Sequence, residues 1–215
     1  MIGQLSFLIF SMDDGFDNIK EFWNKEAFNY DNHMLRTGHY DAQDKIIESF
    51  VNYIKSPIID LAAGPGHMSE NLVSRGFTVS VNDFSHSMIE ICKDKLKRFH
   101  DVRFTQDNAE TIVNESKFST IVCANLFYYL KNRKEAINSW KSILNKDGII
   151  LVIEEYPFQK PDSQDDFSNE ERLMELIDPL SPNEIKEYFS EFKLIDETKI
   201  SIDDKHDLFG FVFQL

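Results

Sequence analysis

Apolar runs typical of buried strands alternate with helical patterns along most of this chain, and this alternation limits the folds that it can adopt. Each run is short, rich in β-branched residues and followed by a segment with apolar residues spaced three and four apart. Strands covered on both faces show such continuous apolar runs. The pattern predicts an α/β domain with five βα units, whose strands are Ile58–Ala62, Thr78–Val81, Val102–Thr105, Phe118–Ala124 and Ile149–Ile153.

The last part of the chain departs from this alternation. Two β-rich segments, Lys193–Ile200 and Leu208–Leu215, are separated by too few residues for a helix and therefore predict an antiparallel hairpin. Five parallel strands and this hairpin give a mixed seven-stranded sheet. Before it, Ser181-Pro182-Asn183-Glu184 has the residues of a helix start. The acidic stretch at about 157–180 has no clean period until residue 172 and is predicted to be a lid-like insertion.

Capping residues predict where the helices of the βα units begin and end. A helix at 68–75 is expected to end at Gly76, and Ser85 or Ser87 is expected to cap the next one. Asn132 and Glu135 have the spacing of a capping box, and Gly148 is expected to stop the helix that follows.

Composition limits the partners and the compartment. The 215 residues carry a formal net charge of −14, which opposes binding to nucleic acids and to anionic membranes. Cys92 and Cys123 lie in apolar surroundings and predict reduced core thiols, hence a cytoplasmic protein. The apolar stretch 2–10 is too short to span a bilayer. We expect an aromatic-rich helical cover segment at 1–50 and one domain at 51–215.

The loop after the first strand, Asp60-Leu61-Ala62-Ala63-Gly64-Pro65-Gly66-His67, lies between a strand and a helix. Glycine lets the backbone turn tightly there and approach a ligand closely, although an ordinary βα turn also contains glycine. Dinucleotide binding requires G-x-G-x-x-G, but the position five residues after Gly64 is Ser69. The loop therefore gives little support to NAD binding.

This loop resembles the first motif of the class I S-adenosylmethionine-dependent methyltransferases, D-x-G-x-G-x-G, with alanine at its first glycine. Four later segments extend the resemblance, and each lies at an end of a predicted strand. They are Val81-Asn82-Asp83-Phe84-Ser85, Gln106-Asp107-Asn108-Ala109 and Cys123 to Leu130, with Lys146-Asp147-Gly148 before the fifth strand. The resemblance implies a Rossmann-like three-layer sandwich and S-adenosylmethionine as cofactor.

The resemblance also implies which residues hold that cofactor. Asp83 would accept the ribose hydroxyls, the segment Asp107 to Ala109 would meet the adenine, and Asn125 would lie beneath the methionine part. Asp83 alone is also typical of a helix start, and Asp107-Asn108 of a surface turn. Tyr30 is similar to a tyrosine that closes over the cofactor. The full set expected at this site is Tyr30, Asp60, Ala62, Gly64, Gly66, Asp83, Phe84, Met88, Asp107, Asn108, Ala109 and Asn125.

Methyl transfer needs in-line positioning and, for a protonated acceptor, a base. The expected catalytic residues are Tyr128 and His39, with His33 and Glu154 as further candidates, although Tyr128 is equally typical of sheet-edge packing. Arg36 is a candidate partner for the methionine carboxylate. The carboxylates of Asp13, Asp14, Asp162, Asp165 and Asp166 lack a recognisable ligand spacing, so no metal site is predicted.

The predicted function is methyl transfer from S-adenosylmethionine to a small-molecule acceptor. Two alternatives remain open at the level of sequence. The same fold can host transfer or cyclisation of the aminocarboxypropyl arm of this cofactor, and it can also serve a non-catalytic binding protein. The sequence leaves the acceptor and the oligomeric state undetermined.

Overall fold

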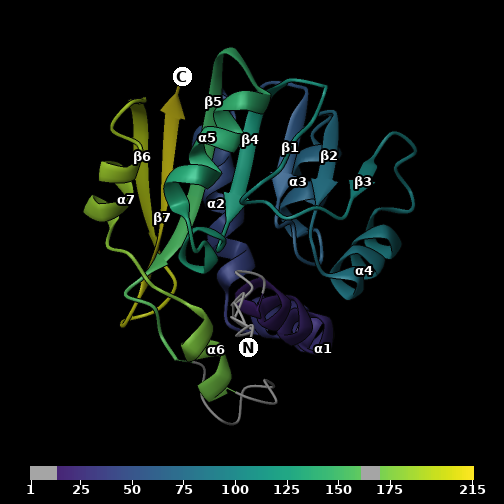
Figure 1. Cartoon of the computed structure of the whole chain (residues 1–215), viewed down its shortest axis with the longest axis vertical. Coiled ribbons are helices and arrows are strands. Elements are labelled where there is room, and N and C mark those ends of the chain that lie inside the picture. Colours follow the sequence, from purple (N-terminus) through teal and green to yellow (C-terminus); the bar gives the residue numbers. More distant parts are fainter. Residues whose placement is uncertain (1–13, 161–169) are drawn as a thin grey trace, which may run out of the picture.

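The computed structural model describes residues 14–160 and 170–215 and contains a single mixed sheet (Figure 1). Its strands lie in the order β3-β2-β1-β4-β5-β7-β6, with the first five parallel and β7 antiparallel to both neighbours. This confirms the predicted seven-stranded sheet and its terminal hairpin. The strands are β1 (Ile58–Leu61), β2 (Val79–Asn82), β3 (Arg103–Thr105), β4 (Phe118–Ala124), β5 (Leu144–Tyr156), β6 (Lys193–Ser201) and β7 (Asp207–Gln214).

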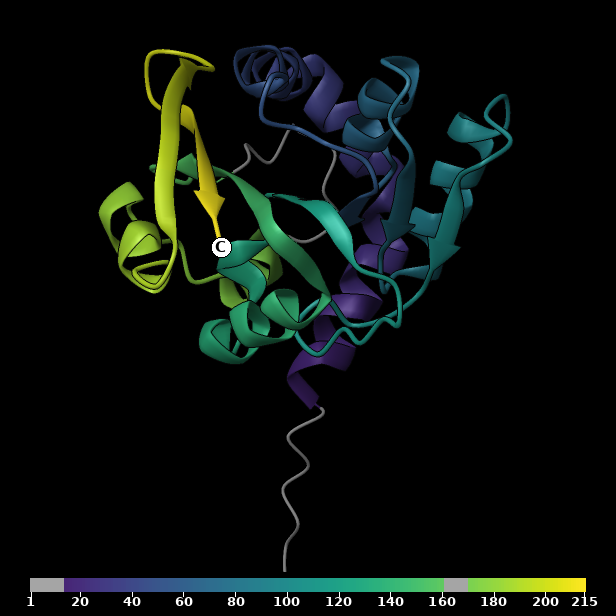
Figure 2. The same ribbon diagram turned by 90° about the horizontal axis from the view of Figure 1, so that it is seen from above.

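Helices cover both faces of the sheet and also its carboxyl edge, where the parallel strands end (Figures 1 and 2). Strand β5 shows how one apolar run serves both faces. Ile150 and Val152 pack with Trp140 in one core, whereas Leu151 and Ile153 pack with Ile47 in the other. The helices are α1 (Asp14–Arg36), α2 (His39–Phe50), α3 (His67–Ser74), α4 (His86–Leu96), the short 3₁₀ helix η1 (Phe127–Tyr129), α5 (Arg133–Ile143), α6 (Glu170–Leu176) and α7 (Pro182–Tyr188).

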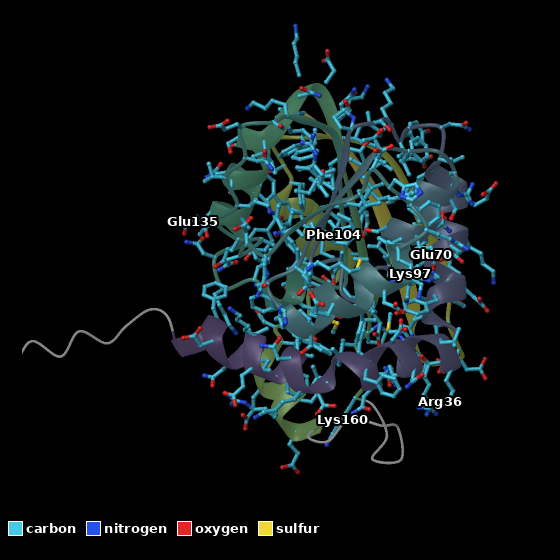
Figure 3. All side chains as sticks on the ribbon, turned by 90° about the vertical axis from the view of Figure 1, so that its right-hand side faces the viewer. Arg36, Glu70, Lys97, Phe104, Glu135 and Lys160 are labelled. Carbon is cyan, nitrogen blue, oxygen red and sulfur yellow. The ribbon has the colours of Figure 1, made fainter. Side chains whose placement is uncertain are left out.

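The covering helices divide into three groups. Helices α2, α3 and α4 supply the core on one face, and α5 and α7 supply the core on the other. Helix α1 crosses the carboxyl edge, at the bottom of Figures 1 and 3. Its Ile19 and Trp23 pack with Met88 of α4 and with Leu173 and Leu176 of α6. This arrangement closes a third apolar cluster over the ends of the strands.

Several predicted helix boundaries are confirmed. Ser85 caps α4, because its hydroxyl accepts a hydrogen bond from Met88 N–H. The start of α7 has a complete capping box between Ser181 and Glu184. Helix α3 ends at Ser74, shortly before Gly76, which has a φ of 89°.

Helix α5 starts at its predicted cap, but the capping box is only half formed and the end of the helix differs from the prediction. Asn132 does accept from Glu135 N–H, but its own N–H donates to the carboxylate of Glu110, so the capping box is incomplete. Gly148 does not stop the helix. Helix α5 ends at Ile143, and β5 begins at Leu144 because this residue is already extended and pairs with Phe118.

Gly148 is required for a different reason. It lies in an irregular part of β5, where the pairing with β4 shifts register. A Cβ atom at this position would lie 2.7 Å from Leu144 Cγ and 2.9 Å from the carbonyl oxygen of Asn145. The chain therefore uses this glycine to fold back tightly before the buried part of the strand.

Some sequence expectations lie outside the described residues. These are the apolar stretch 2–10, the central part of the predicted insertion, and the aspartates at 13, 162, 165 and 166; of Asp14, only the backbone is described. Within 14–160 and 170–215, no helix combines the length and the apolar character that crossing a membrane requires.

Candidate active site at the carboxyl edge of the sheet

Strands β1 and β4 lie side by side, and the chain leaves them toward opposite faces of the sheet. The segment after β1 leads to α3 on one face, and the segment after β4 leads to α5 on the other. Open α/β sheets bind ligands in the crevice at such a switch point. The predicted site residues from four different segments meet at this edge.

The loop after β1 has a backbone conformation that favours residues without a large side chain. Ala62, Gly64 and Gly66 all have positive φ angles, of 52°, 54° and 85°. A Cβ on Gly66 would lie 2.3 Å from Cys92 Sγ, so this glycine allows the start of α3 to pack against α4. Ala62 and Gly64 line the cavities described below, whereas Gly66 does not.

Asp60 lies beneath this loop. Its carboxylate accepts a hydrogen bond of 2.6 Å from Ser69 Oγ in α3, and burial raises the pKa of this carboxyl group to about 7. It lines a small cavity that also contacts Tyr30, Ala62 and Gly64. Asp60 thereby ties the end of β1 to the helix that follows the loop.

Asp83, at the end of β2, is held by two backbone amides. Gly64 N–H donates to Oδ2 at 2.9 Å, and Ser85 N–H donates to Oδ1 at 2.8 Å. Burial raises the pKa of this carboxyl group to about 6, so it is mostly ionised at neutral pH. Each oxygen retains a further lone pair that can accept from a ligand hydroxyl. Phe84 and Met88 line the same cavity as Asp83.

The segment after β3 is fixed from both sides. Asp107 C=O accepts from Asn82 Nδ2, and Ala109 C=O accepts from Trp140 Nε1 at 2.7 Å. Asn108 Oδ1 accepts from Glu110 N–H, which makes the turn that the sequence also allowed. Asp107, Asn108 and Ala109 all line one cavity beside Asn82.

Adjacent cavities share their walls along this edge. The cavity at Asp107 to Ala109 shares Ala62, Phe84 and Tyr129 with the cavity at Asp83, and we call these two together the loop cavity. The loop cavity adjoins a larger one of about 260 Å³, which we call the histidine cavity. The residues common to both are Trp23, Tyr30, Asn125, Tyr128 and Tyr129.

The shared wall contains two predicted site residues in contact. Burial raises the pKa of Tyr30 well above its ordinary value, and a hydrogen bond with the Asn125 side chain opposes that effect. Asn125 follows β4 with a φ of 53°, and its buried Oδ1 has no hydrogen-bond partner. An orphaned buried acceptor between two cavities is suited to receive a ligand donor.

The two predicted catalytic residues both line the histidine cavity. Tyr128 is in η1, and burial raises the pKa of its phenol well above the ordinary value. Its ring also packs against Tyr129 and Phe158, as the alternative reading expected. His39 is the first residue of α2 and lies 3.4 Å from Glu155, measured between Nε2 and Oε2.

The other candidate residues, His33, Arg36 and Glu154, lie in three different places. His33 lines the histidine cavity beside His39. Arg36 is exposed at the end of α1 and lines none of these cavities (Figure 3). Glu154 lies under η1, where Oε1 accepts from Leu126 N–H and Phe127 N–H at 2.9 and 2.5 Å. Burial raises its pKa to about 8.

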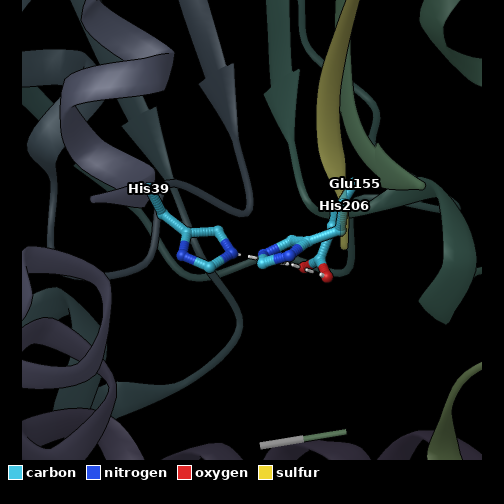
Figure 4. A group of neighbouring side chains, drawn as sticks. All are labelled: His39, Glu155 and His206. Carbon is cyan, nitrogen blue, oxygen red and sulfur yellow. Dashed lines mark hydrogen bonds and ion pairs between the residues drawn. The ribbon is translucent and has the colours of Figure 1, made fainter. Parts of the chain in front are cut away.

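Glu155 and His206, which no sequence motif indicates, complete a cluster with His39 (Figure 4). His206 Nε2 lies 3.8 Å from Glu155 Oε1. The three residues are far apart in the chain and form no motif. The one local cue was a pair of glutamates at the end of the buried β5 run.

A family model described as methyltransferase domain matches residues 58–148. The YqeM protein of Bacillus subtilis is 32% identical over 123 residues, which make up 55% of this chain and 49% of that protein. Malonyl-[acyl-carrier protein] O-methyltransferase 2 of Ilyobacter polytropus is 24% identical over 189 residues, or 86% of this chain and 68% of the relative. The chain thus spans about half the length of the first relative.

Solved structures show the same fold. The N-methyltransferase NodS of Bradyrhizobium japonicum, in complex with S-adenosylhomocysteine, has a TM-score of 0.69 at 16% identity and covers 92% of this chain and 98% of its own. Magnesium protoporphyrin IX methyltransferase of Synechocystis, with bound S-adenosylmethionine, has a TM-score of 0.70 at 14% identity, covering 94% and 98%. Residues 58–148 thus match a methyltransferase-domain family model, and the chain has the fold of these solved methyltransferases.

Proposed function

We propose that this protein transfers a methyl group from S-adenosylmethionine to a small-molecule acceptor. The observation that carries the proposal is that the two cavities adjoin and share lining residues. The loop cavity contains a carboxylate held by Gly64 and Ser85, and it shares its Tyr30–Asn125 wall with a larger cavity of about 260 Å³. A cofactor in the first cavity would face an acceptor in the second.

The residues of the loop cavity fit the proposed cofactor. Asp83 has lone pairs for the two ribose hydroxyls, and Asp107, Asn108 and Ala109 form the wall suited to an adenine ring. The unpartnered Asn125 Oδ1 suits the ammonium group of the methionine part. In this proposal Tyr30 covers the methionine end, Phe84 and Met88 supply apolar walls, and Asp60 and Gly66 shape the loop.

The histidine cavity suits a small acceptor better than a polymer. Helices α1 and α6 form part of its wall, through Trp23 and Leu173. When bound, S-adenosylmethionine supplies a methyl group already activated by its sulfonium, so the chain needs mainly to orient the acceptor and exclude water. Tyr128 and His39 are the proposed catalytic side chains, because both residues line this cavity and both side chains carry polar groups. The net charge of −14 argues against polynucleotide acceptors.

The experiment is calorimetry followed by product analysis. We expect the full chain to bind S-adenosylhomocysteine with micromolar affinity or better and to show no heat with NAD. Incubation with S-adenosylmethionine and a pool of small metabolites should yield S-adenosylhomocysteine. Methylthioadenosine as product would instead indicate transfer of the aminocarboxypropyl arm. Binding without any turnover would favour a non-catalytic protein, and binding of NAD alone would exclude the proposed cofactor.

A further inference from the structure

Three buried ligating side chains converge in the wall of the histidine cavity, from parts of the fold that the sequence keeps far apart (Figure 4). His39 opens α2, Glu155 lies near the end of β5, and His206 directly precedes β7. Each side chain is less than a tenth exposed, and one ligand atom from each lies within 4.8 Å of the other two.

The hydrogen bonds of His39 determine which ring nitrogen carries the proton when the ring is neutral. Thr37 Oγ1 donates its proton to the carbonyl oxygen of His33 at 2.7 Å, so it can only accept from His39 Nδ1, which lies 2.7 Å away. The proton of a neutral ring is therefore on Nδ1. The lone pair on Nε2 then faces Glu155.

His206 is arranged in the same way. Its Nδ1 lies 2.8 Å from Asp203 Oδ1, an acceptor that also receives hydrogen bonds from the backbone N–H groups of Lys205 and His206. This contact again places the proton of the neutral ring on Nδ1 and leaves the Nε2 lone pair toward Glu155. Two neutral rings thus present lone pairs to one carboxylate.

The carboxylate of Glu155 is itself oriented by the backbone. Gln159 N–H donates to its Oε1 at 2.8 Å, whereas Oε2 faces His39. Histidines whose second nitrogen is held by an acceptor, together with a hydrogen-bonded carboxylate, are the arrangement that proteins use around a bound metal. Lone pairs that face a carboxylate repel it unless a cation or added protons lie between them.

We propose that His39 Nε2, Glu155 and His206 Nε2 bind one divalent transition-metal ion, with zinc the best match to this donor set. Tetrahedral zinc with ligand bonds of about 2.0–2.1 Å separates its ligand atoms by about 3.3 Å. His39 Nε2 lies 3.4 Å from Glu155 Oε2, His206 Nε2 lies 3.8 Å from Glu155 Oε1, and one ligand atom from each residue lies within 4.8 Å of the other two, so the three side chains would have to draw closer to bind an ion. Three protein ligands leave a position open to the cavity.

If the histidine cavity holds the methyl acceptor, the open coordination position of the ion could bind that acceptor. A metal ion at this point would bind and acidify an acceptor oxygen beside the Tyr30–Asn125 wall. Lys160 and Lys205 line the same cavity, and their charge also favours an acceptor with an anionic oxygen. This role rests on the proposed function, whereas metal binding itself does not.

The test uses the full chain, stripped of metal with a chelator and titrated with Zn²⁺ by calorimetry and with Co²⁺ by visible absorption. We expect one ion per chain, an absorption spectrum typical of four- or five-coordinate Co²⁺, and a higher melting temperature with the metal. His39→Asn, Glu155→Gln and His206→Asn should each weaken Zn²⁺ binding by at least about a hundredfold, because each removes a ligand from a three-ligand site.

Two further variants distinguish metal binding at this site from the effects of unfolding and from metal binding at the protein surface. Thr37→Val removes the acceptor that orients His39 without touching a ligand and should weaken binding about tenfold to a hundredfold. His100→Asn changes an exposed histidine outside the cavity and should leave binding unchanged. Circular dichroism and S-adenosylhomocysteine binding check the fold of each variant and report separately on the cofactor.

The proposal is overturned if the stripped chain binds neither ion, or if the ligand variants and Thr37→Val bind as tightly as the wild-type chain. Metal binding that survives alongside failed cofactor binding would support this site and contradict only the proposed methyl transfer.

Discussion

The loop cavity and the histidine cavity adjoin at the same edge of the sheet, yet they are built in different ways. The loop cavity takes most of its polar groups from residues at or just after the ends of β1, β2, β3 and β4, and backbone amides hold its central carboxylate, Asp83. The three ligating side chains of the histidine cavity, at positions 39, 155 and 206, meet only through the fold. A site of the first kind leaves a motif in the sequence, and a site of the second kind does not.

The largest effect that tests this comparison concerns the stability of the loop. Gly66→Ala should lower the free energy of unfolding by about 2–4 kcal/mol, because a side chain in the left-handed region and overpacking against Cys92 both cost free energy. Urea denaturation measures the change. Gly76→Ala is the control, since Gly76 has a similar φ of 89° but no atom within 4 Å of an added Cβ. Equal losses in both variants would show that the contact with Cys92 is unimportant.

The second effect concerns Asp83. Asp83→Ala should weaken S-adenosylhomocysteine binding about tenfold to a hundredfold, since hydrogen bonds to a charged group each contribute about 1.5–3 kcal/mol. It should also lower the melting temperature, because the N–H groups of Gly64 and Ser85 lose their acceptor. Calorimetry and thermal denaturation of the same variant measure both quantities.

Two further measurements sharpen the result for Asp83. Asp83→Asn retains one acceptor oxygen and should lose less stability than Asp83→Ala. In the wild-type chain, affinity should decrease as the pH falls below about 6, where this carboxyl group becomes protonated. A lower melting temperature with unchanged affinity would mean that Asp83 only positions the loop.

A third effect tests the wall of the histidine cavity, where Glu154 supports η1. Burial raises its pKa from 4.5 in the unfolded reference to about 8, so its stabilising contribution is complete below pH 4.5 and is lost as the pH rises through about 8. Glu154→Gln cannot ionise. Between pH 5 and pH 9 its free energy of unfolding should therefore decrease less than that of the wild-type chain, by about 1 kcal/mol or more.

The wild-type chain and Glu154→Gln are compared by the slope of the free energy of unfolding against pH. Asp60 and Asp83 also have raised pKa values, so they lower the stability with rising pH in both proteins. Denaturant unfolding at a series of pH values gives the two curves. Parallel curves would show that Glu154 is not a buried titrating group.

The smallest effect concerns the alanine at the first glycine position of the loop. Ala62 has a φ of 52°, so Ala62→Gly relieves backbone strain while giving the unfolded chain more freedom. We expect a net gain of about 0.5 kcal/mol in the free energy of unfolding. Ala63→Gly, at a neighbour without a positive φ, should instead lose stability. A loss in both variants would show that Ala62 is unstrained.

The difference between local and long-range contacts also explains which helix boundaries the sequence predicted correctly. The capping residues Ser85 and Ser181 could be recognised because each acts on amides three residues away. Gly148 was assigned the wrong role, because pairing of Leu144 with the distant Phe118 decided where α5 ends. Asn132 likewise donates its N–H to Glu110, a residue outside its own helix.

The sequence by itself determined the order of strands and helices, the loop after β1 and the position of Asp83 before the cap of α4, because hydrophobic periodicity, glycine and short-range hydrogen bonds act between residues close in the chain. Only the tertiary structure decided that His39, Glu155 and His206 share one cavity wall. Their proximity depends on the antiparallel pairing of β5 with β7 and on the packing of α2 beside them. Such contacts are properties of the folded chain, and no local pattern encodes them.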